Sequence, residues 1–473
     1  MSGLDTTTHL LYLLSAVGFV LGLHLMNSPA TARRGNQLSG AGMALAVAIT
    51  VVVLADDDLI TRTGVAVLAA GLAAGGVAGA VIARRIAMTA MPQLVSVLNA
   101  VGGGAAALIA LGEAIPHRGS VPLAQLPVST TLTTSLDLLI GGVTLSGSVV
   151  AAGKLAGVVP GRPLAFRGGR LLSLLLAAAA VAAGAVYTAG RGGVPVLCVV
   201  AVAALVIGVL GTLPIGGADM PVVISLLNAC TGTAVAMAGF VLHSTPLIIA
   251  GALVGAAGAI LTKLMADAMN RSLVNIVAGG FGTGDEQSSV APAAGSTVRE
   301  VTPDDAALQL AYASKVVLVP GYGLAAAQAQ HELVALAHAL GEHGVEVSYG
   351  IHPVAGRMPG HMNVLLSEAN APYTQLKDLE EINRVFPTAD VVLVVGANDV
   401  TNPAARRPGN PVSGMPILDV DQARSVIVIK RSLGHGYAGM ENELYAHPRT
   451  AMLFGDARTV LATLNSALTA YVS

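Results

Sequence analysis

The stretch Val316-Val-Leu-Val-Pro-Gly-Tyr-Gly-Leu-Ala-Ala-Ala327 decides how the C-terminal part of this 473-residue chain folds. Its apolar, β-branched first half predicts a buried strand, and its last residues favour a helix. Between them, Gly321, Gly323 and Ala326 have the spacing with which a strand–turn–helix unit presents backbone N–H groups to a pyrophosphate. The spacing alone is a weak signal, but the strand before it and the helix after it are the right context. We therefore predict a dinucleotide site here.

The residues after this stretch continue the same alternation of strand and helix patterns. Strands are expected at 315–319, 345–351, 390–395, 417–420, 425–429 and 451–454, and helices at 325–342 and 457–470. Such alternation is typical of a doubly wound parallel sheet. Residues 303–473 are therefore predicted to form an α/β Rossmann-like domain, preceded by a Gly-, Ser- and Pro-containing linker at 282–302.

Charged residues at the strand ends indicate which dinucleotide binds. An NAD site places Asp or Glu at the end of its second strand, but Tyr349-Gly-Ile-His-Pro-Val354 has no acid there. Lys430-Arg431-Ser432 ends a later strand, and basic groups pair with a 2′-phosphate that a carboxylate would repel. This pattern favours NADP(H) over NAD(H). The alternative for Lys430 and Arg431 is an ordinary solvated strand end.

Three further glycine-rich turns each follow a predicted strand, at 354–360, 396–399 and 434–439. Open α/β sheets build their ligand crevice from such turns. We expect Tyr437, between glycines, to lie over the bound cofactor. Asp399 is the one acid in these turns, and either a turn-capping or a titrating role fits it.

Composition places the rest of the chain in a membrane. The chain is 54% hydrophobic and 11% charged, whereas a soluble protein has about 25% charged residues. The net charge of −2 gives no sign of nucleic-acid binding. Cys198 and Cys230 lie in apolar stretches and form neither a disulfide framework nor a zinc site.

Nine stretches before residue 282 are long enough to cross about 30 Å of hydrocarbon. They lie at 8–26, 38–54, 64–83, 88–111, 136–155, 171–189, 194–213, 222–242 and 246–265, although eight or ten spans remain possible. Basic residues gather after the first, third, fifth and ninth stretches, which places the N-terminus outside and the Rossmann-like domain in the cytoplasm. Ionisable residues of the spans are expected near span ends, as for His24, Lys154, His243 and Lys263.

An internal repeat carries the polar residues of the spans. Met91-Pro-Gln-Leu-Val-Ser-Val-Leu-Asn99-Ala recurs as Met220-Pro-Val-Val-Ile-Ser-Leu-Leu-Asn228-Ala, directly after Asp219. Each copy puts Ser and Asn on one helix face about two turns into the membrane, which favours a shared polar site at depth. The alternative is hydrogen bonding between packed helices. Two glycine series at a spacing of four, Gly71/Gly75/Gly79 and Gly251/Gly255, predict close helix packing.

Several sequence segments, spread over essentially the whole chain, together resemble the beta subunit of the proton-translocating NAD(P)⁺ transhydrogenase. They are 142–154, 219–221 and 268–272 in the membrane part, and 316–330, 352–363, 395–399, 430–432, 436–439 and 453–457 beyond it. The resemblance implies hydride transfer between NAD(H) on a partner subunit and NADP(H) on this chain while protons cross the membrane. No catalytic side chain is expected, because hydride passes directly between nicotinamides.

The resemblance also implies roles for individual residues. Arg357, Lys430 and Arg431 would bind the cofactor phosphates. Asp399 would link the binding of the cofactor to a change in protonation. Arg271 would lie at the hinge between the membrane part and the Rossmann-like domain. The expected cofactor-binding residues are Gly321, Tyr322, Gly323, Ala326, Val354, Ala355, Gly356, Arg357, Met358, Gly396, Ala397, Asn398, Asp399, Lys430, Arg431, Ser432, Gly436, Tyr437, Ala438, Gly439, Asp456 and Ala457. The expected proton-path and coupling residues are Asn99, Ser146, Asp219, Asn228, Arg271 and Asp399.

One departure concerns the membrane proton site, which the family often forms with a histidine at the position of Asn99 or Asn228. Asn cannot titrate, so the resemblance implies a histidine on a partner helix or a chain of water molecules instead. The expected partner is an alpha subunit that carries the NAD(H) site and further membrane helices, in a dimer of the αβ unit in a bacterial inner membrane. A competing interpretation is an ion channel or transporter regulated by a cytoplasmic nucleotide-binding domain.

Overall fold

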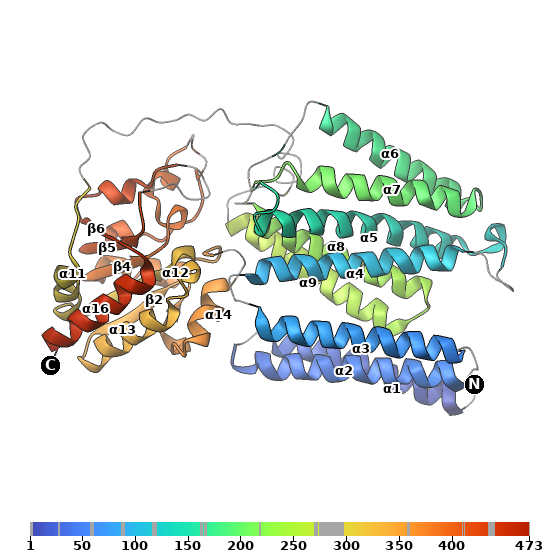
Figure 1. Cartoon of the computed structure of the whole chain (residues 1–473), viewed down its shortest axis with the longest axis horizontal. Coiled ribbons are helices and arrows are strands. Elements are labelled where there is room, and N and C mark those ends of the chain that lie inside the picture. The colour runs from blue at the N-terminus through green and yellow to red at the C-terminus, as the bar shows by residue number, and fades with distance from the viewer. Residues whose placement is uncertain are drawn as a thin grey trace. The chain divides into compact units, whose positions relative to one another are not determined.

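This computed structural model describes residues 3–26, 29–56, 61–86, 90–115, 121–160, 164, 168–216, 219–268, 273, 298–356, 360–408, 410, 412–433 and 440–472. The chain separates into two compact units, Met1–Ile215 with Val223–Thr262 and Gly216–Val222 with Lys263–Ser473. The first is a set of long helices and the second contains a sheet covered by shorter helices (Figure 1).

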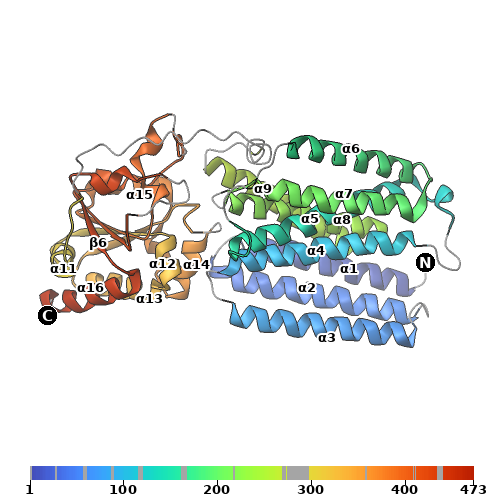
Figure 2. The ribbon, with the colours of Figure 1, turned by 45° about the horizontal axis from the view of Figure 1, so that its top comes forward.

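Within the described residues, nine helices are long and apolar enough to cross a membrane, and each of them contains most of one predicted stretch. Figures 1 and 2 show them lying roughly parallel to one another. They are α1 (Gly3–Leu25), α2 (Pro29–Asp56), α3 (Arg62–Arg85), α4 (Met91–Ala114), α5 (Val128–Leu155), α6 (Gly169–Thr188), α7 (Gly193–Thr212), α8 (Met220–Val241) and α9 (Thr245–Ala268).

The helix α5 begins eight residues before the predicted start of the fifth span, at Val128 rather than at 136. Its first turns are rich in Thr and Ser, which the hydropathy pattern excluded. Their hydroxyls donate to carbonyls of the preceding turn of the same helix, for example Thr134 to Thr130 at 2.8 Å and Ser135 to Thr131 at 3.0 Å. Because the hydroxyls are satisfied within the helix, the polar run continues it in a membrane.

Small residues let several of these helices approach closely, as the glycine series predicts for α9. A Cβ added at Gly251 would lie 2.4 Å from Ala236 N and 2.7 Å from Gly232 O of α8. For α3 the described residues show no such neighbour, since nothing lies within 4 Å of a Cβ added at Gly71, Gly75 or Gly79. The residues of α3 are all exposed or half-buried.

The second unit contains a six-stranded, fully parallel sheet in the order β3-β2-β1-β4-β5-β6, which confirms the predicted Rossmann-like fold. Its strands are β1 (Lys315–Pro320), β2 (Glu346–Gly350), β3 (Leu376–Lys377), β4 (Val391–Val395), β5 (Ser425–Lys430) and β6 (Thr450–Phe454). Its helices are α11 (Pro303–Ala311), α12 (Tyr322–Ala327), α13 (Gln330–Glu342), α14 (His361–Glu368), α15 (Leu379–Asn383) and α16 (Ala457–Val472).

Alternate residues of the central strands form the core on one face of the sheet. Val317, Val392 and Val426 lie in register across β1, β4 and β5 and pack with Ile382, Phe386 and Leu418. The core residues reach 0% exposure, as expected for strands covered on both faces.

One predicted element of this unit is wrong, and another differs in its bounds. The strand expected at 417–420 is irregular chain leading into a 3₁₀ turn at Val420–Gln422, and its apolar residues are buried in the core without pairing to the sheet. The helix expected at 325–342 begins earlier, at Tyr322, and is broken at Gln328, which has φ +51°. The 417–420 run is apolar because it is buried, and in so short a run periodicity cannot distinguish a buried irregular segment from a buried strand.

Candidate functional site

The predicted cofactor residues follow the carboxyl ends of β1, β2, β4, β5 and β6. Because all strands are parallel, these ends lie along one edge of the sheet. The strand order reverses between β1 and β4, whose following turns begin at Gly321 and Gly396. This is the switch point at which open α/β sheets bind ligands.

Glycine is required at both turns because their backbones touch. A Cβ on Gly321 would lie 2.4 Å from Ala397 Cα, and one on Gly323 would lie 2.6 Å from Gly396 Cα. Gly396 also has φ +67°, a conformation that other residues rarely adopt. The N–H groups of Gly321 and Gly323 donate to Val395 O and Gly396 O, each at 2.9 Å. These two glycines therefore join the turns, and their N–H groups already have backbone acceptors.

The third position of the fingerprint has a different environment from the one expected. Ala326 is exposed, whereas Leu324 and Ala325 are the residues of α12 that pack inward. The helix that follows the fingerprint is only six residues long. Ala326 therefore does not provide the close helix–strand packing that the third small residue of this spacing usually provides.

A polar network fixes the turn after β4, and the sequence analysis missed two of its residues. Asn442 Nδ2 donates to Asn398 O at 2.9 Å, and Tyr445 Oη donates to Asn398 Oδ1 at 2.9 Å. Asn442 also caps the 3₁₀ turn Glu443–Ala446 through its Oδ1. An Asn before Glu-Leu-Tyr signals such a cap, but nothing in the sequence shows that it lies against residue 398.

Lys430 lies in the same network, with Nζ 4.7 Å from the centre of the Tyr445 ring. Burial lowers the pKa of the Lys430 ammonium, and the charge of Asp399 opposes that shift. Burial also raises the pKa of the Tyr445 phenol, and the charge of Asp399 adds to this effect. Asp399 and Lys430, both predicted, are therefore close enough at the carboxyl edge for the charge of Asp399 to act on the ammonium.

Arg431 points to a carboxylate at the end of the neighbouring strand. Its Nη2 and Nε lie 2.6 and 3.1 Å from Asp456 Oδ2, and the guanidinium side chain is 67% exposed. The hydrogen bond from Arg431 is the main reason that the pKa of the Asp456 carboxyl is below its usual range. Asp456 Oδ1 accepts from Arg458 N in the first turn of α16, which begins at Ala457. Ser432 is exposed beside Arg431.

The turn after β2 is organised by two buried histidines. His352 Nδ1 accepts from Val354 N at 3.2 Å, which leaves Nε2 to donate to Pro416 O at 2.7 Å. Burial lowers the pKa of His352 to about 4. Gly356 has φ +99°, and a Cβ there would lie 2.5 Å from His361 Nδ1. Ala355 is buried and Val354 half-buried.

The predicted residues Arg357, Met358, Gly436, Tyr437, Ala438, Gly439 and Arg271 lie outside the described residues. Their proposed roles remain predictions.

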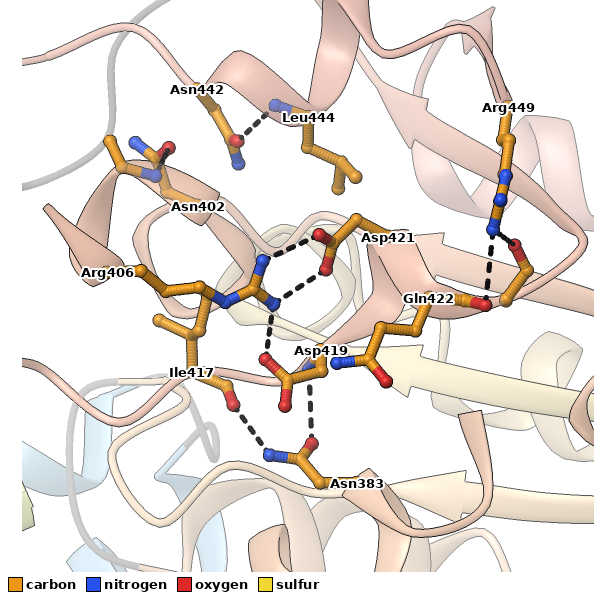
Figure 3. A network of polar contacts seen from close by, with 12 residues as sticks. Asn383, Asn402, Arg406, Ile417, Asp419, Asp421, Gln422, Asn442, Leu444 and Arg449 are labelled. Atoms are coloured by element: carbon orange, nitrogen blue, oxygen red, sulfur yellow. Dashed lines mark hydrogen bonds and ion pairs between the residues drawn. The ribbon is translucent and has the colours of Figure 1, made fainter. Parts of the chain in front are cut away.

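Figure 3 shows the contacts that hold the neighbouring loops. Arg406 donates to both Asp419 and Asp421, with Nη1 2.7 Å from Asp421 Oδ2. The hydrogen bond to Asp421 is the main reason that the pKa of Arg406 is raised. Asn383 Nδ2 donates to Ile417 O at 2.9 Å, and Asn383 Oδ1 accepts from Asp419 N. These bonds fix residues 417–421, which include the 417–420 run that was expected to be a strand.

In the membrane unit the repeated Ser–Asn motifs face neighbouring helices. Asn99 is buried and its Nδ2 donates to Ile224 O of α8 at 3.3 Å. Ser225 donates to Gly258 O of α9 at 3.3 Å and accepts from Thr262 at 3.0 Å. Asn228 is half-buried. The bonds of Asn99 and Ser225 match the helix-packing alternative.

The other predicted path residues have contacts of their own. Ser146 donates to Gly142 O within α5 and faces α7, where a Cβ on Gly208 would lie 2.1 Å from its Oγ. Asp219 forms the turn that leads into α8. Lys154 lies near a span end, as expected, and its Nζ donates to Leu213 O and Ile215 O at 2.5 and 2.7 Å.

Asp137 contradicts the expectation that ionisable residues lie near span ends. The early start of α5 places it nine residues inside a membrane helix, where it is 0% exposed. A single acid between apolar residues was visible in the sequence, but the predicted span began at 136 and so put it at the edge.

Among the described residues, no group of three His, Cys, Asp or Glu side chains is suited to a metal ion.

The comparisons with known proteins agree with these features. Residues 8–467 match the family described as NAD(P) transhydrogenase beta subunit. The chain is 45% identical over 461 residues to the NAD(P) transhydrogenase subunit beta of Rhodospirillum rubrum, which covers 97% of this chain and 98% of that protein. The subunit from a particular strain of the same species has the same identity and coverage. This match over nearly the whole chain agrees with the apolar helices and the parallel Rossmann-like sheet of its described residues, and this protein belongs to the NAD(P) transhydrogenase beta subunit family.

Proposed function

We propose that this chain binds NADP(H) at the carboxyl edge of its sheet and couples hydride exchange with NAD(H) on an alpha subunit to proton movement across the membrane. The observation that carries the proposal is the combination, at one strand-order switch point, of two touching glycine turns with Lys430 and Arg431. The soluble domain lies in the cytoplasm of a bacterium in this proposal, with the nine spans in its inner membrane and the αβ unit in a dimer.

The residues present fit a phosphorylated dinucleotide. The glycine contacts hold the two turns close, and the first described residues after β2, Ile351 to Gly356, include no carboxylate that would repel a 2′-phosphate. Arg431 is 67% exposed and its planar guanidinium suits bidentate binding of a phosphate. Its present partner, Asp456, is an exposed carboxylate, and exposed ion pairs contribute only about 0–1 kcal/mol. A phosphate with two negative charges is therefore able to displace Asp456 at small cost.

The nicotinamide of the bound cofactor supplies the hydride chemistry, and the chain supplies position and gating. Asp399 has the properties of a coupling residue, since its charge acts on both Lys430 and Tyr445 in the network that fixes the turn after β4. In the proposal, a change in the charge of Asp399 changes the stability of this network and therefore the hold of the turn on the cofactor. Asn99 and Asn228 would line the membrane path without carrying charge.

Family membership favours this function over a channel regulated by a nucleotide-binding domain. A beta subunit implies an alpha-subunit partner. Hydride exchange needs two bound nucleotides, whereas the described residues of this chain form one Rossmann-like sheet.

The test is nucleotide binding by the purified chain followed by turnover with the alpha subunit. NADPH should bind much more tightly than NADH to the chain alone by isothermal titration. Addition of the alpha subunit should then give hydride transfer from NADH to an NADP⁺ analogue, with proton movement in sealed vesicles. Equal affinity for NADPH and NADH would reject the cofactor assignment, and nucleotide-dependent ion flux without hydride transfer would support the channel instead.

A further inference from the structure

Asp137 is a carboxyl group inside the membrane helix α5 that no contact in the described chain satisfies. It lies nine residues after Val128, which is about 14 Å along the helix. It is 0% exposed, and neither carboxyl oxygen has a hydrogen-bond partner among the described residues. Ionisable residues at such depth are rare in membrane proteins and mark proton or ion pathways by default.

The carboxyl lies on the face of α5 that packs against α4. Gly141 and Thr144 follow Asp137 by one and two turns on the same face. A Cβ on Gly141 would lie 2.6 Å from Gly103 O and 3.0 Å from Ala107 N of α4. Thr144 is fully buried there, with its Cβ 2.8 Å from a Cβ added at Gly103. Asp137 therefore lies in the seam between α4 and α5, one turn from this closest approach.

The same seam contains further buried polar atoms without protein partners. Ser148 continues the α5 face one turn beyond Thr144, and its Oγ has no partner in the described chain. On α4, Ser96 Oγ is likewise buried without a partner, one turn from Asn99. Buried polar groups in proteins are almost always bonded to protein or to water. A row of such atoms from Asp137 towards Ser96 has the chemistry that a chain of water molecules requires.

The helices packed against α5 offer Asp137 no counter-charge within the described residues. On α4 the one ionisable residue is Glu113, which is exposed. The helices α7 and α8 carry no Asp, Glu, Lys, Arg or His. On α6 the titratable groups are Tyr187, which is buried in an apolar cluster, and Arg170 in the first turn. On α5 itself, Lys154 is seventeen residues further on and bonds to backbone carbonyls of Leu213 and Ile215.

We propose that Asp137 is the group of this chain that binds and releases the translocated proton within the membrane, with the α4–α5 seam as its route. This inference rests on the proposed function and identifies a titrating residue that Asn99 and Asn228 cannot provide. Among membrane-helix residues whose side chains are described, Asp137 is the only buried carboxyl or imidazole. The carboxyl O–H bond breaks, the proton passes to a water molecule and the electron pair stays on the carboxylate. A proton from the opposite side then restores the acid.

The test uses the complete complex of this chain with its alpha subunit in sealed vesicles. Asp137→Asn keeps the shape and removes the titrating group, Asp137→Glu keeps a carboxyl, and Glu113→Gln is the matched control on the exposed face of α4. We expect Asp137→Asn to lower proton movement per vesicle at least tenfold while NADPH affinity stays within twofold of wild type. Asp137→Glu should restore proton movement with a shifted pH profile, and Glu113→Gln should behave as wild type.

Proton movement at the wild-type rate in Asp137→Asn would overturn the inference. Loss of NADPH affinity together with proton movement would also overturn it, because the residue would then be structural. If the complex with Asp137→Asn does not assemble, the Asp137→Glu variant decides. A wild-type pH profile of its proton movement rejects the inference, and a displaced profile supports it. A wild-type complex that transfers hydride without moving protons would instead contradict the proposed function itself.

Discussion

Arg431 illustrates how one residue serves both the folded chain and the proposed ligand. Its guanidinium holds the Asp456 carboxylate at 2.6 Å, and Asp456 in turn accepts from the first turn of α16. This contact keeps an exposed Arg side chain directed along the carboxyl edge of the sheet. Arg431, one of the two basic residues predicted to bind the cofactor phosphates, is therefore already paired with a carboxylate. That carboxylate belongs to Asp456, which the sequence analysis expected to bind the cofactor.

Arg431→Ala should weaken NADPH binding by roughly 1.5 kcal/mol, about tenfold in Kd, because a charged hydrogen bond to the phosphate is lost. The value is at the low end of the usual range since the wild-type side chain must first leave Asp456. NADH affinity should not change. Isothermal titration of both nucleotides measures this effect. Arg424→Ala is the matched control, because Arg424 forms a similar exposed pair with Asp390 at the other edge of the sheet. An equal loss for NADH would contradict the role.

His352 should make the Rossmann-like domain less stable in mild acid. Its folded pKa is about 4 and its ordinary value 6.5, so the unfolded chain binds a proton more readily between these values. The free energy of unfolding therefore has its full value, as far as His352 is concerned, above about pH 6.5. It falls by roughly 3 kcal/mol as the pH approaches 4. Urea unfolding of the segment from Thr297, measured against pH, tests this. His343→Asn, at an exposed histidine, should leave the profile unchanged, and a flat wild-type profile from pH 6.5 to 4.5 would disagree with the structure.

At the scale of elements, the membrane helices are arranged by small residues rather than by charge. Close approaches join Gly103 with Gly141, Gly208 with Ser146 and Gly232 with Gly251. Since lipid is as apolar as the side chains, close van der Waals contact and interhelical hydrogen bonds hold such helices together. Between α4 and α8 the bond from Asn99 to Ile224 O adds to this packing.

Gly251→Val should destabilise the chain by about 1–3 kcal/mol, because its Cβ would meet the α8 backbone at 2.4 Å. Gly75→Val is the control, since nothing in the described chain lies within 4 Å of its Cβ. Thermal unfolding of the purified chain in detergent distinguishes the two. Equal effects of both substitutions would mean that α8 and α9 do not pack as described.

Asn99→Leu and Asn228→Leu should lower proton movement and proton-driven reverse turnover, because Leu cannot hold water by hydrogen bonds. Moving one charge through 100 mV is worth about 2.3 kcal/mol, so a modest change in the path is enough to uncouple transfer from pumping. NADPH binding should remain intact. Proton uptake in sealed vesicles, beside nucleotide affinity, measures both. Unchanged pumping in both variants would leave these residues with the helix-packing role that the bond of Asn99 already indicates.

At the scale of the whole molecule, the chain contains one Rossmann-like sheet within its described residues and belongs to a beta-subunit family. Hydride transfer needs a donor and an acceptor nucleotide at the same time. The purified chain should therefore have no transhydrogenase activity with NADH and an NADP⁺ analogue, and activity should appear when the alpha subunit is added. Sustained turnover by this chain alone would refute the split between subunits.

The sequence by itself determined the features that depend on neighbouring residues. Nine apolar runs of sufficient length predict nine membrane helices, and β-branched runs such as Val316 to Val319 predict strands of a parallel sheet. These follow from local hydropathy and from the geometry of the backbone, both of which a short window of sequence contains. The glycine fingerprint was found for the same reason, although its contacts were not.

Only the tertiary structure decided what depends on residues far apart in the chain. The N–H groups of Gly321 and Gly323 bond to a turn about 75 residues later, and Asn442 bonds to Asn398 across 44 residues. Asp137 became a buried group because Thr and Ser hydroxyls extend α5 and because α4 covers its face. Periodicity records which residues avoid water, but it does not record which partner covers them, and that partner decides the chemistry of each site.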